Sequence, residues 1–459
     1  MAAGELSPRP GPAHTHPRVS RVAWLLLAGF VLSRAPLLGG GFGSDDDSWR
    51  NAVAALRMRE IGHYIPSRVP GFPLFEGLMA GLIRGGPNAT NGAAALAGLA
   101  ATILFWRLLR ARGVREPIWP LLAFAFGAPL WIRCTQSMDY AFGLAFFLAA
   151  WLAALSRRYG PAGILVALAT GCRPSYALAS LPMLVLMQAR REPPRRFLAY
   201  GLGLAPLTAA LFTPVLLSPE AEHLERHIAH HAARAHVTAG NALWMAKRGA
   251  LFALGRPGLL AAGLAIAAAL AARWRRRSEP RPALPGAGAV RAFEVSLALS
   301  IGGFWLLIPY DEAYLLPLVP LALIALARSL PRAWLVATML AITAEPLVSI
   351  RLDARLVPGE LFQEIAERRR QLAEVRALLE RRPTVPTVYV VGRAAVLRLL
   401  VLDPSLARMA PAWSPFHQPG VALVSRDGRR SFAEDLEPGQ EAALASEGRA
   451  VERVRFSGR

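Results

Sequence analysis

The stretch GGGFGSDDDSWRNAVAALRMREIGHYIPSRVPGFPLFEG, residues 39–77, separates an apolar run from the next segment long enough to cross a membrane. It holds three consecutive aspartates, Asp45 to Asp47, and then the sequence Ser-Arg-Val-Pro-Gly around Arg68. A polar, acidic stretch between apolar runs is typical of a membrane protein that carries its chemistry in a loop.

The composition places the whole chain in the membrane-protein class. Of 459 residues, 54% are hydrophobic and only 18% are charged, and the mean hydropathy is +0.34. A net charge of +21 would suggest nucleic acid as the partner of a soluble protein. Here the arginines lie in short clusters between apolar runs, where the positive-inside rule puts them. We therefore expect a lipid bilayer, and not nucleic acid, around a mainly α-helical, polytopic chain.

Apolar runs predict about eleven transmembrane helices in a domain covering residues 20–350, after a Pro-rich, disordered N-terminus at 1–19. The apolar stretch 73–83 is too short to cross and is predicted as a helix at the membrane surface. The expected spans are 20–39, 91–109, 117–133, 137–155, 161–173, 176–189, 197–217, 251–272, 291–308, 313–328 and 333–350.

The basic clusters orient these spans. With 73–83 outside the membrane, all of them fall on the cytoplasmic side. This arrangement predicts a multi-pass protein with a cytoplasmic N-terminus and external loops at 40–90 and 218–250. The high content of Ala, Arg, Gly and Pro suggests a bacterial protein, so we expect the inner (plasma) membrane. The clusters lie at 107–115, 157–158, 190–196, 273–277 and 328–332.

Asp45, Asp46 and Asp47 lie at the start of an expected helix, since apolar residues recur at helical spacing from Trp49 to Ile61. One carboxylate is enough to cap a helix. Three in a row repel one another, so at least one should have a raised pKa, which suits a general base or a metal ligand. A solvated, capped loop is the alternative.

Two arginines occupy the same external face. Arg68 lies between Pro66 and Pro70, which stiffen its loop, and its guanidinium suits a phosphate. Its alternatives are a lipid headgroup contact or a salt bridge to an aspartate. Arg173 separates two half-length helices at membrane depth, where a charge indicates a functional site. Its alternative is snorkelling to the interface.

Other polar residues are candidates for supporting roles. Tyr64 precedes Arg68 in the same loop and is a candidate for acceptor contact or support. Asp311 and Glu312, in IPYDEAYLLP, either assist at the site or cap a helix and remain solvated. Asp139, in TQSMDYAFG, is interpreted as a helix cap.

The sequence predicts no metal site and no resident cofactor. The histidines of HLERHIAHHAARAH lack the H-E-x-x-H arrangement and fit an amphipathic helix on lipid better than a zinc site. No nucleotide-binding motif occurs in a credible context, although paired aspartates leave a divalent cation open. Cys134 and Cys172 make no disulfide framework. The four histidines concerned are His223, His227, His230 and His231.

The C-terminal part, 351–459, is expected to form an extracytoplasmic helix followed by a small α/β domain. GELFQEIAERRRQLAEVRALLERR reads as an amphipathic helix. After it TVYVVG, GVALVSR and AVERVRF read as strands, and RAAVLRLLVL and GQEAALASEG as helices. This domain either positions an acceptor or is a stabilising cap.

DDDSWRNAVAAL, GHYIPSRVPGFPLFEGLMAGL, WRLLRARG and the paired short helices of ATGCRPSYALASLPML together resemble membrane glycosyltransferases of the GT-C superfamily, particularly the family 39-like proteins. These include protein O-mannosyltransferases and lipid A aminoarabinose transferases. The resemblance covers roughly residues 20–350. The chain has Asp-Asp-Asp in place of the commoner Asp-Glu pair, and SRVPGFP in place of a His-Pro-Pro-like stretch.

The resemblance implies a sugar donor on a polyprenyl phosphate, used on the external face, with an acceptor that is a protein, lipid or glycan. It also implies that an aspartate of the first external loop is the catalytic base. Asp45 is the first choice, because Trp49 then takes the aromatic position four residues later, and Asp47 is the second. Arg68 and Arg173 suit the departing lipid phosphate.

Two rival hypotheses remain. A transporter or lipid flippase would use intramembrane charges and broken helices, with inverted repeats that are not evident here. The sequence also leaves open a catalytically inactive relative that serves as an assembly partner.

Overall fold

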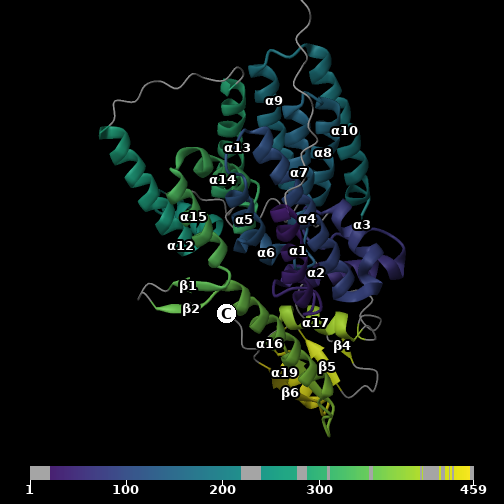
Figure 1. Ribbon diagram of the computed structural model, residues 1–459. Helices are drawn as coiled ribbons and strands as arrows, with labels where there is room; N and C mark the ends of the chain where they lie inside the picture. Colours follow the sequence, from purple (N-terminus) through teal and green to yellow (C-terminus); the bar gives the residue numbers. More distant parts are fainter. Residues whose placement is uncertain are drawn as a thin grey trace, which may run out of the picture.

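The computed structural model of the protein is a helical bundle with a mixed α/β module at one end (Figure 1). In Figure 1 the module, in green to yellow, lies next to α2 and the lower end of the bundle. The structure describes residues 21–218, 239–275, 287–307, 311–350, 355–403, 406, 423–424, 430–433, 435–436 and 439–454.

Among the described residues, four helical stretches are long and apolar enough to cross a membrane: Pro73–Ala111, Pro194–Leu216, Ala242–Ala268 and Gly288–Leu307. Shorter apolar helices pack beside them, so the expected number of about eleven spans stays a prediction. The bundle helices are α1 (Arg21–Arg34), α4 (Gly86–Ala111), α5 (Ile118–Phe126), α6 (Ala128–Arg133), α7 (Tyr140–Leu155), α8 (Tyr159–Cys172), α9 (Ser180–Ala189), α10 (Pro194–Leu216), α12 (Ala239–Arg275), α13 (Ala287–Leu307), α14 (Leu318–Ser329) and α15 (Arg332–Ala344).

Three expected spans differ from the structure because glycine and proline interrupt them. The span expected at 117–133 divides into α5 and α6 at Gly127, whose backbone is extended. In α12 the chain bends at Gly255, with φ 65°, two residues before Pro257. The last span ends at Ala344 and not at 350, and the residues that follow form a strand.

The external loop expected at 218–250 overlaps a helix at its end. Its last residues belong to α12, which starts at Ala239. The four candidate histidines lie at 223–231, outside the described residues.

Helices α8 and α10 approach each other through glycines. A Cβ atom added at Gly163 would lie 2.2 Å from the backbone oxygen of Tyr200, and one at Gly203 would lie 2.4 Å from that of Gly160. These distances are below any normal contact. Because glycine has no side chain, the backbones of α8 and α10 can come into direct contact at these positions.

The segment expected to form an external loop at 40–90 folds into two helices. Asp45 caps α2 (Asp46–Ile61), accepting a hydrogen bond from the backbone nitrogen of Asp47 at 3.0 Å, and Gly62, with φ 75°, ends the helix. The short helix expected at 73–83 is α3 (Pro73–Leu82). A 3-10 turn, η2 (Ile83–Gly85), joins it to α4.

The C-terminal module contains a four-stranded sheet of order β4-β5-β3-β6. Central β3 pairs in parallel with β5 and β6, while β4 is antiparallel to β5. A two-stranded hairpin, β1 with β2, connects the bundle to α16. The elements are β1 (Val348–Ile350), β2 (Leu356–Pro358), α16 (Glu360–Glu380), β3 (Thr387–Val390), α17 (Arg393–Leu402), β4 (Leu423–Val424), β5 (Arg430–Ala433), α19 (Gln440–Ser446) and β6 (Ala450–Arg453).

One hydrophobic core is shared by α2, α3 and the C-terminal module. Trp49 and Phe75 belong to it together with Val375, Tyr389 and Leu399. The module is therefore packed onto α2 and α3 by buried apolar surface, which stabilises both partners.

We predict that Gly163→Ala destabilises the bundle by about 1–3 kcal/mol, because its methyl group overlaps the backbone of α10. Gly201→Ala on α10 is the matched control, since a Cβ atom there meets nothing within 4 Å. Thermal unfolding of both variants in the same detergent measures the difference. Equal unfolding temperatures would contradict this packing.

Candidate active site

Four carboxylates and three guanidiniums alternate in a chain of ion pairs at the end of the bundle that meets the module. Its members come from five separate parts of the sequence, and each neighbouring pair lies within 3.7 Å. Buried charges persist only when they are paired in this way. In order, the chain is Asp45, Arg133, Asp311, Arg173, Asp139, Arg68 and Asp47.

Asp139 joins the two most buried arginines of this ion-pair chain. Its two oxygens lie 2.7 Å from Arg68 Nη2 and 2.8 Å from Arg173 Nη1, and its side chain is 0% exposed. The interpretation of Asp139 as a helix cap is wrong, because its side chain makes no capping hydrogen bond to α7. Two guanidiniums compete for its oxygens, and charged partners bind a carboxylate more strongly than backbone N–H groups.

Arg173 is buried and does not snorkel. Its Nη2 lies 3.3 Å from Asp311, and its guanidinium packs over the rings of Tyr140 and Tyr314 at 4.3 and 4.4 Å. Pro174 accounts for the position of Arg173 directly after α8. The residue before a proline favours an extended backbone, so the helix ends at Cys172 and Arg173 is extended.

Arg68 forms a salt bridge to an aspartate, which the sequence analysis gave as an alternative to a free phosphate-binding arginine. It pairs with Asp47 at 3.0 Å as well as with Asp139, and its guanidinium lies over the Phe72 ring at 4.1 Å. The loop that carries it is organised by Glu76, which is 1% exposed. Glu76 accepts hydrogen bonds from the backbone nitrogen of Ser67 at 2.6 Å, that of Phe72 at 2.8 Å, and the hydroxyls of Ser67 and Tyr64.

The three aspartates have different surroundings. Burial raises the pKa of Asp45, whose only charged partner among the described residues is Arg133, at 3.5 Å. Burial would also raise the pKa of Asp47, but Arg68 and Arg50 outweigh it and hold that pKa below the usual value. Asp46 pairs with Arg398 of α17 at 2.9 Å. Asp45 is therefore the carboxylate best suited to take up a proton.

The remaining candidates have supporting positions. Asp311 caps the 3-10 turn η4 (Glu312–Leu315) and accepts a hydrogen bond from Tyr140. Although burial opposes it, Arg133 and Arg173 lower the pKa of Asp311 to about 2, so Asp311 stays ionised. Glu312 pairs with Arg248 of α12 and lies outside the ion-pair chain.

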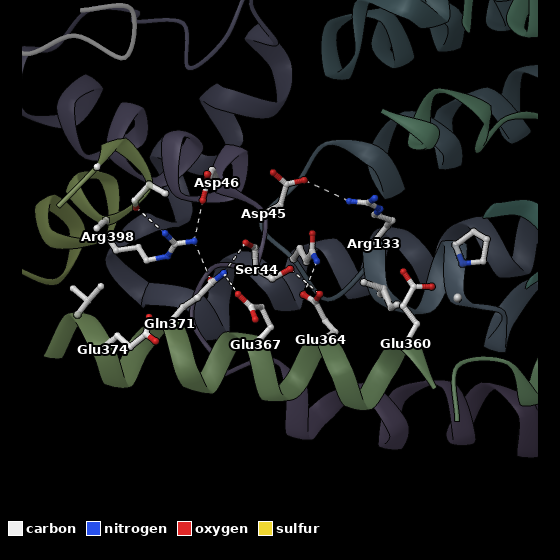
Figure 2. Close-up of a pocket in the computed structure, with 18 of the residues that line it drawn as sticks. Ser44, Asp45, Asp46, Arg133, Glu360, Glu364, Glu367, Gln371, Glu374 and Arg398 are labelled. Carbon is white, nitrogen blue, oxygen red and sulfur yellow. Dashed lines mark hydrogen bonds and ion pairs between the residues drawn. The ribbon is translucent and has the colours of Figure 1, made fainter. Parts of the chain in front are cut away.

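A cavity of about 550 Å³ lies beside Asp45. It is enclosed by the loop at 44–46, by α6 and the residues after it, and by α16 and the start of α17. Figure 2 shows glutamates of α16 following one another along one side of the cavity, facing Ser44, Asp45 and Asp46. Asp45 and Asp46 line this space, and Arg133 connects it to the ion-pair chain.

The sequence reasoning missed Arg133, Asp139 and Glu76 as site residues. A signal was present for the first two, since TQSMDYAFG and the arginine before it lie on the same predicted face as the aspartates. For Glu76 the signal was a carboxylate inside an otherwise apolar helix start. Within the described part of the chain, no group of three or more metal-ligating side chains could hold a metal ion. Cys134 and Cys172 are buried free thiols.

Comparison with solved structures gives a match to "ArnT from Cupriavidus metallidurans bound to Undecaprenyl phosphate". The TM-score is 0.53 and the sequence identity 14%, over 93% of this chain and 95% of that chain. The chain has a GT-C-like fold. This confirms the fold that the sequence resemblance implied. Comparison with family models and with curated proteins gives no match.

We predict that Glu76→Ala loosens the loop that holds Arg68 and costs about 3 kcal/mol or more, because the backbone nitrogens of Ser67 and Phe72 and the Tyr64 hydroxyl lose their acceptor. Hydrogen exchange at the Ser67 and Phe72 amides should rise. Glu60→Ala, at an exposed position of α2, is the control and should change stability by less than about 0.5 kcal/mol. Unchanged exchange at both amides would refute the role of Glu76.

Proposed function

We propose that this protein transfers a sugar from a polyprenyl-phosphate donor to an acceptor hydroxyl on the extracytoplasmic face, with Asp45 as the general base. The observation that carries the proposal is the position of Asp45, a partly buried carboxylate with a raised pKa at the wall of a cavity. The GT-C-like fold supports it, since the similar protein ArnT binds undecaprenyl phosphate.

In the proposed reaction Asp45 removes the proton of the acceptor hydroxyl, whose oxygen attacks the anomeric carbon. The bond from that carbon to the phosphate oxygen breaks, and the lipid phosphate leaves with the electron pair. Single displacement of this kind inverts the anomeric centre. A base with a raised pKa holds the transferred proton more firmly than an ordinary aspartate does.

Arg68 and Arg173 are the proposed partners of the departing phosphate. In each arginine the two terminal nitrogens, Nη1 and Nη2, pair with carboxylates. The Nε of each has no partner among the described residues. A guanidinium has five N–H donors, so hydrogen-bonding capacity remains for a phosphate. Charge that develops on the leaving oxygen would be stabilised by these fixed donors.

The extracytoplasmic location of the site and of the C-terminal module is also a proposal. It is supported by the arginine clusters of the sequence, which fall at the opposite ends of the helices from the aspartates. We propose that Asp46 and Asp47 hold neighbouring residues in place and do not act as the base, because Asp46 pairs with Arg398 and Asp47 pairs with Arg68.

We predict that Asp45→Asn lowers kcat for sugar transfer by about 10²–10⁴-fold, because the amide cannot take up the proton. Transfer from radiolabelled polyprenyl-phosphate sugars in membranes measures the loss. Asp435→Asn, at an exposed position of the C-terminal module, should retain full activity. Full activity of Asp45→Asn in a folded protein would remove the catalytic assignment.

The same assignment fixes the sign of the pH dependence. A base must be deprotonated, so kcat/KM should fall as the pH drops through the raised pKa of Asp45. The acidic limb of the wild-type profile should therefore lie above about 3.9, the ordinary value for an aspartate. A limb at or below that value would identify a different base.

We predict that Arg173→Lys weakens donor binding about tenfold or more, because lysine keeps the charge but loses the planar fork. The donor KM and the inhibition constant of undecaprenyl phosphate should rise together, while the acceptor KM stays constant. Arg449→Lys, on the exposed module surface, is the control. Unchanged donor constants in a folded Arg173→Lys would contradict the phosphate role.

A further inference from the structure

The hairpin of β1 and β2 has one face made entirely of apolar side chains. Side chains that pair across an antiparallel ladder lie on the same face, and so do those two residues apart on one strand. Val348 pairs with Pro358 and Ile350 pairs with Leu356, so these four side chains share a face. We call it the apolar hairpin face.

The opposite face of the hairpin turns toward the bundle. It carries Ser349, whose hydroxyl donates a hydrogen bond to Glu345 Oε1 at 2.9 Å. Glu345 directly follows α15 and lies against α12, since a Cβ atom added at Gly255 would lie 2.4 Å from the Cγ atom of Glu345. The apolar hairpin face therefore points away from the bundle.

The apolar hairpin face is largely exposed. Val348 is 44% exposed and Leu356 is 72% exposed, and Pro358 is also in the exposed class. A two-stranded hairpin is too small to form a hydrophobic core of its own. Large apolar side chains that gather at one exposed place usually mark a surface that contacts a partner or a membrane.

Helix α12 shows where the hairpin lies relative to the membrane. Arg256 Nη1 donates a hydrogen bond to the backbone oxygen of Ile350 at 3.0 Å. Leu260 and Leu264 follow Arg256 at intervals of four residues, so all three lie on one side of α12. Both leucines are largely exposed, and they belong to the stretch Ala242–Ala268, which is long and apolar enough to cross a membrane. This side of α12 therefore faces lipid.

Strand β1 lies at the end of that lipid-facing side. An exposed arginine at the end of a membrane helix is typical of the headgroup region, where its charge reaches water. The link to α15 agrees with this depth, since Val348 follows Ala344, the last residue of α15, by four positions. Figure 1 shows β1 and β2 below α12 and α15 and to one side of the four-stranded sheet.

We propose that the apolar hairpin face inserts into the headgroup region of the lipid bilayer and anchors the C-terminal module to the membrane surface. Lipid is the occupant because this face continues the lipid-facing side of α12. The hairpin is coupled to the start of α16, since the backbone nitrogens of Gly359 and Leu361 donate to the backbone oxygens of Leu347 and Pro346 at 2.9 and 3.0 Å. The anchor therefore sets the height of α16 above the bilayer. The inference does not depend on the proposed reaction.

The test places a nitroxide label on Val348→Cys or Leu356→Cys in the full chain, reconstituted in lipid nanodiscs. The native Cys134 and Cys172 are buried, so the unsubstituted chain should take up little label. Power saturation compares collisions of the nitroxide with oxygen, which concentrates in the bilayer, and with nickel(II) ethylenediaminediacetate, which stays in water. Both hairpin labels should show an oxygen-to-nickel collision ratio severalfold above that of a label in water.

Val385→Cys is the matched control, because Val385 is also an exposed valine, at 50%, and follows the far end of α16. The 21 residues of α16 extend about 30 Å, so this label should collide mainly with the nickel compound. Ratios at Val348→Cys and Leu356→Cys equal to that of the control would overturn the inference. Protection from both reagents would overturn it as well, because protein, such as a second copy of this chain, would then cover the face.

Discussion

The carboxylate of Asp139, held between Arg68 and Arg173, is the interaction on which the site depends. It joins the loop between α2 and α3, the start of α7 and the junction after α8, which are distant in the sequence. Solvent can stabilise these three charges only weakly, because all three side chains are at most 10% exposed. Each therefore requires the others, and the segments that carry them must come together.

Breaks in the helices make this arrangement possible. Pro174 ends α8 and turns Arg173 toward Asp139, and Gly127 divides α5 from α6 close to Arg133. An uninterrupted helix would keep its side chains along the bundle. Short helices with irregular junctions instead place backbone turns and charged side chains at one end, where a polar site is built.

The C-terminal module is part of the site as well as of the fold. It shares a hydrophobic core with α2 and α3, and Arg398 pairs with Asp46. Glu364 of α16 accepts hydrogen bonds from Ser44 at 2.6 Å and from Gln136 at 2.8 Å. The residues on both sides of Asp45 are therefore held by α16 and α17, which also form one wall of the cavity.

Local patterns predicted much of this structure. The cap at Asp45, the helix after it, the amphipathic helix at 360–380 and the junction at Arg173 each depend on residues close in sequence. The bridging role of Asp139 could not be predicted, because a helix cap and an ion pair look alike until distant arginines are placed. Strand β5 was missed because its four residues, RSFA, owe their structure to pairing with β3.

The most direct test of the central claim is the stability of Asp139→Asn together with its sugar transfer. The asparagine has nearly the same shape but leaves Arg68 and Arg173 without their shared charge. We expect a loss of about 3–5 kcal/mol in unfolding free energy, and loss of transfer even at temperatures where the variant remains folded. Wild-type stability and transfer in this variant would contradict the account.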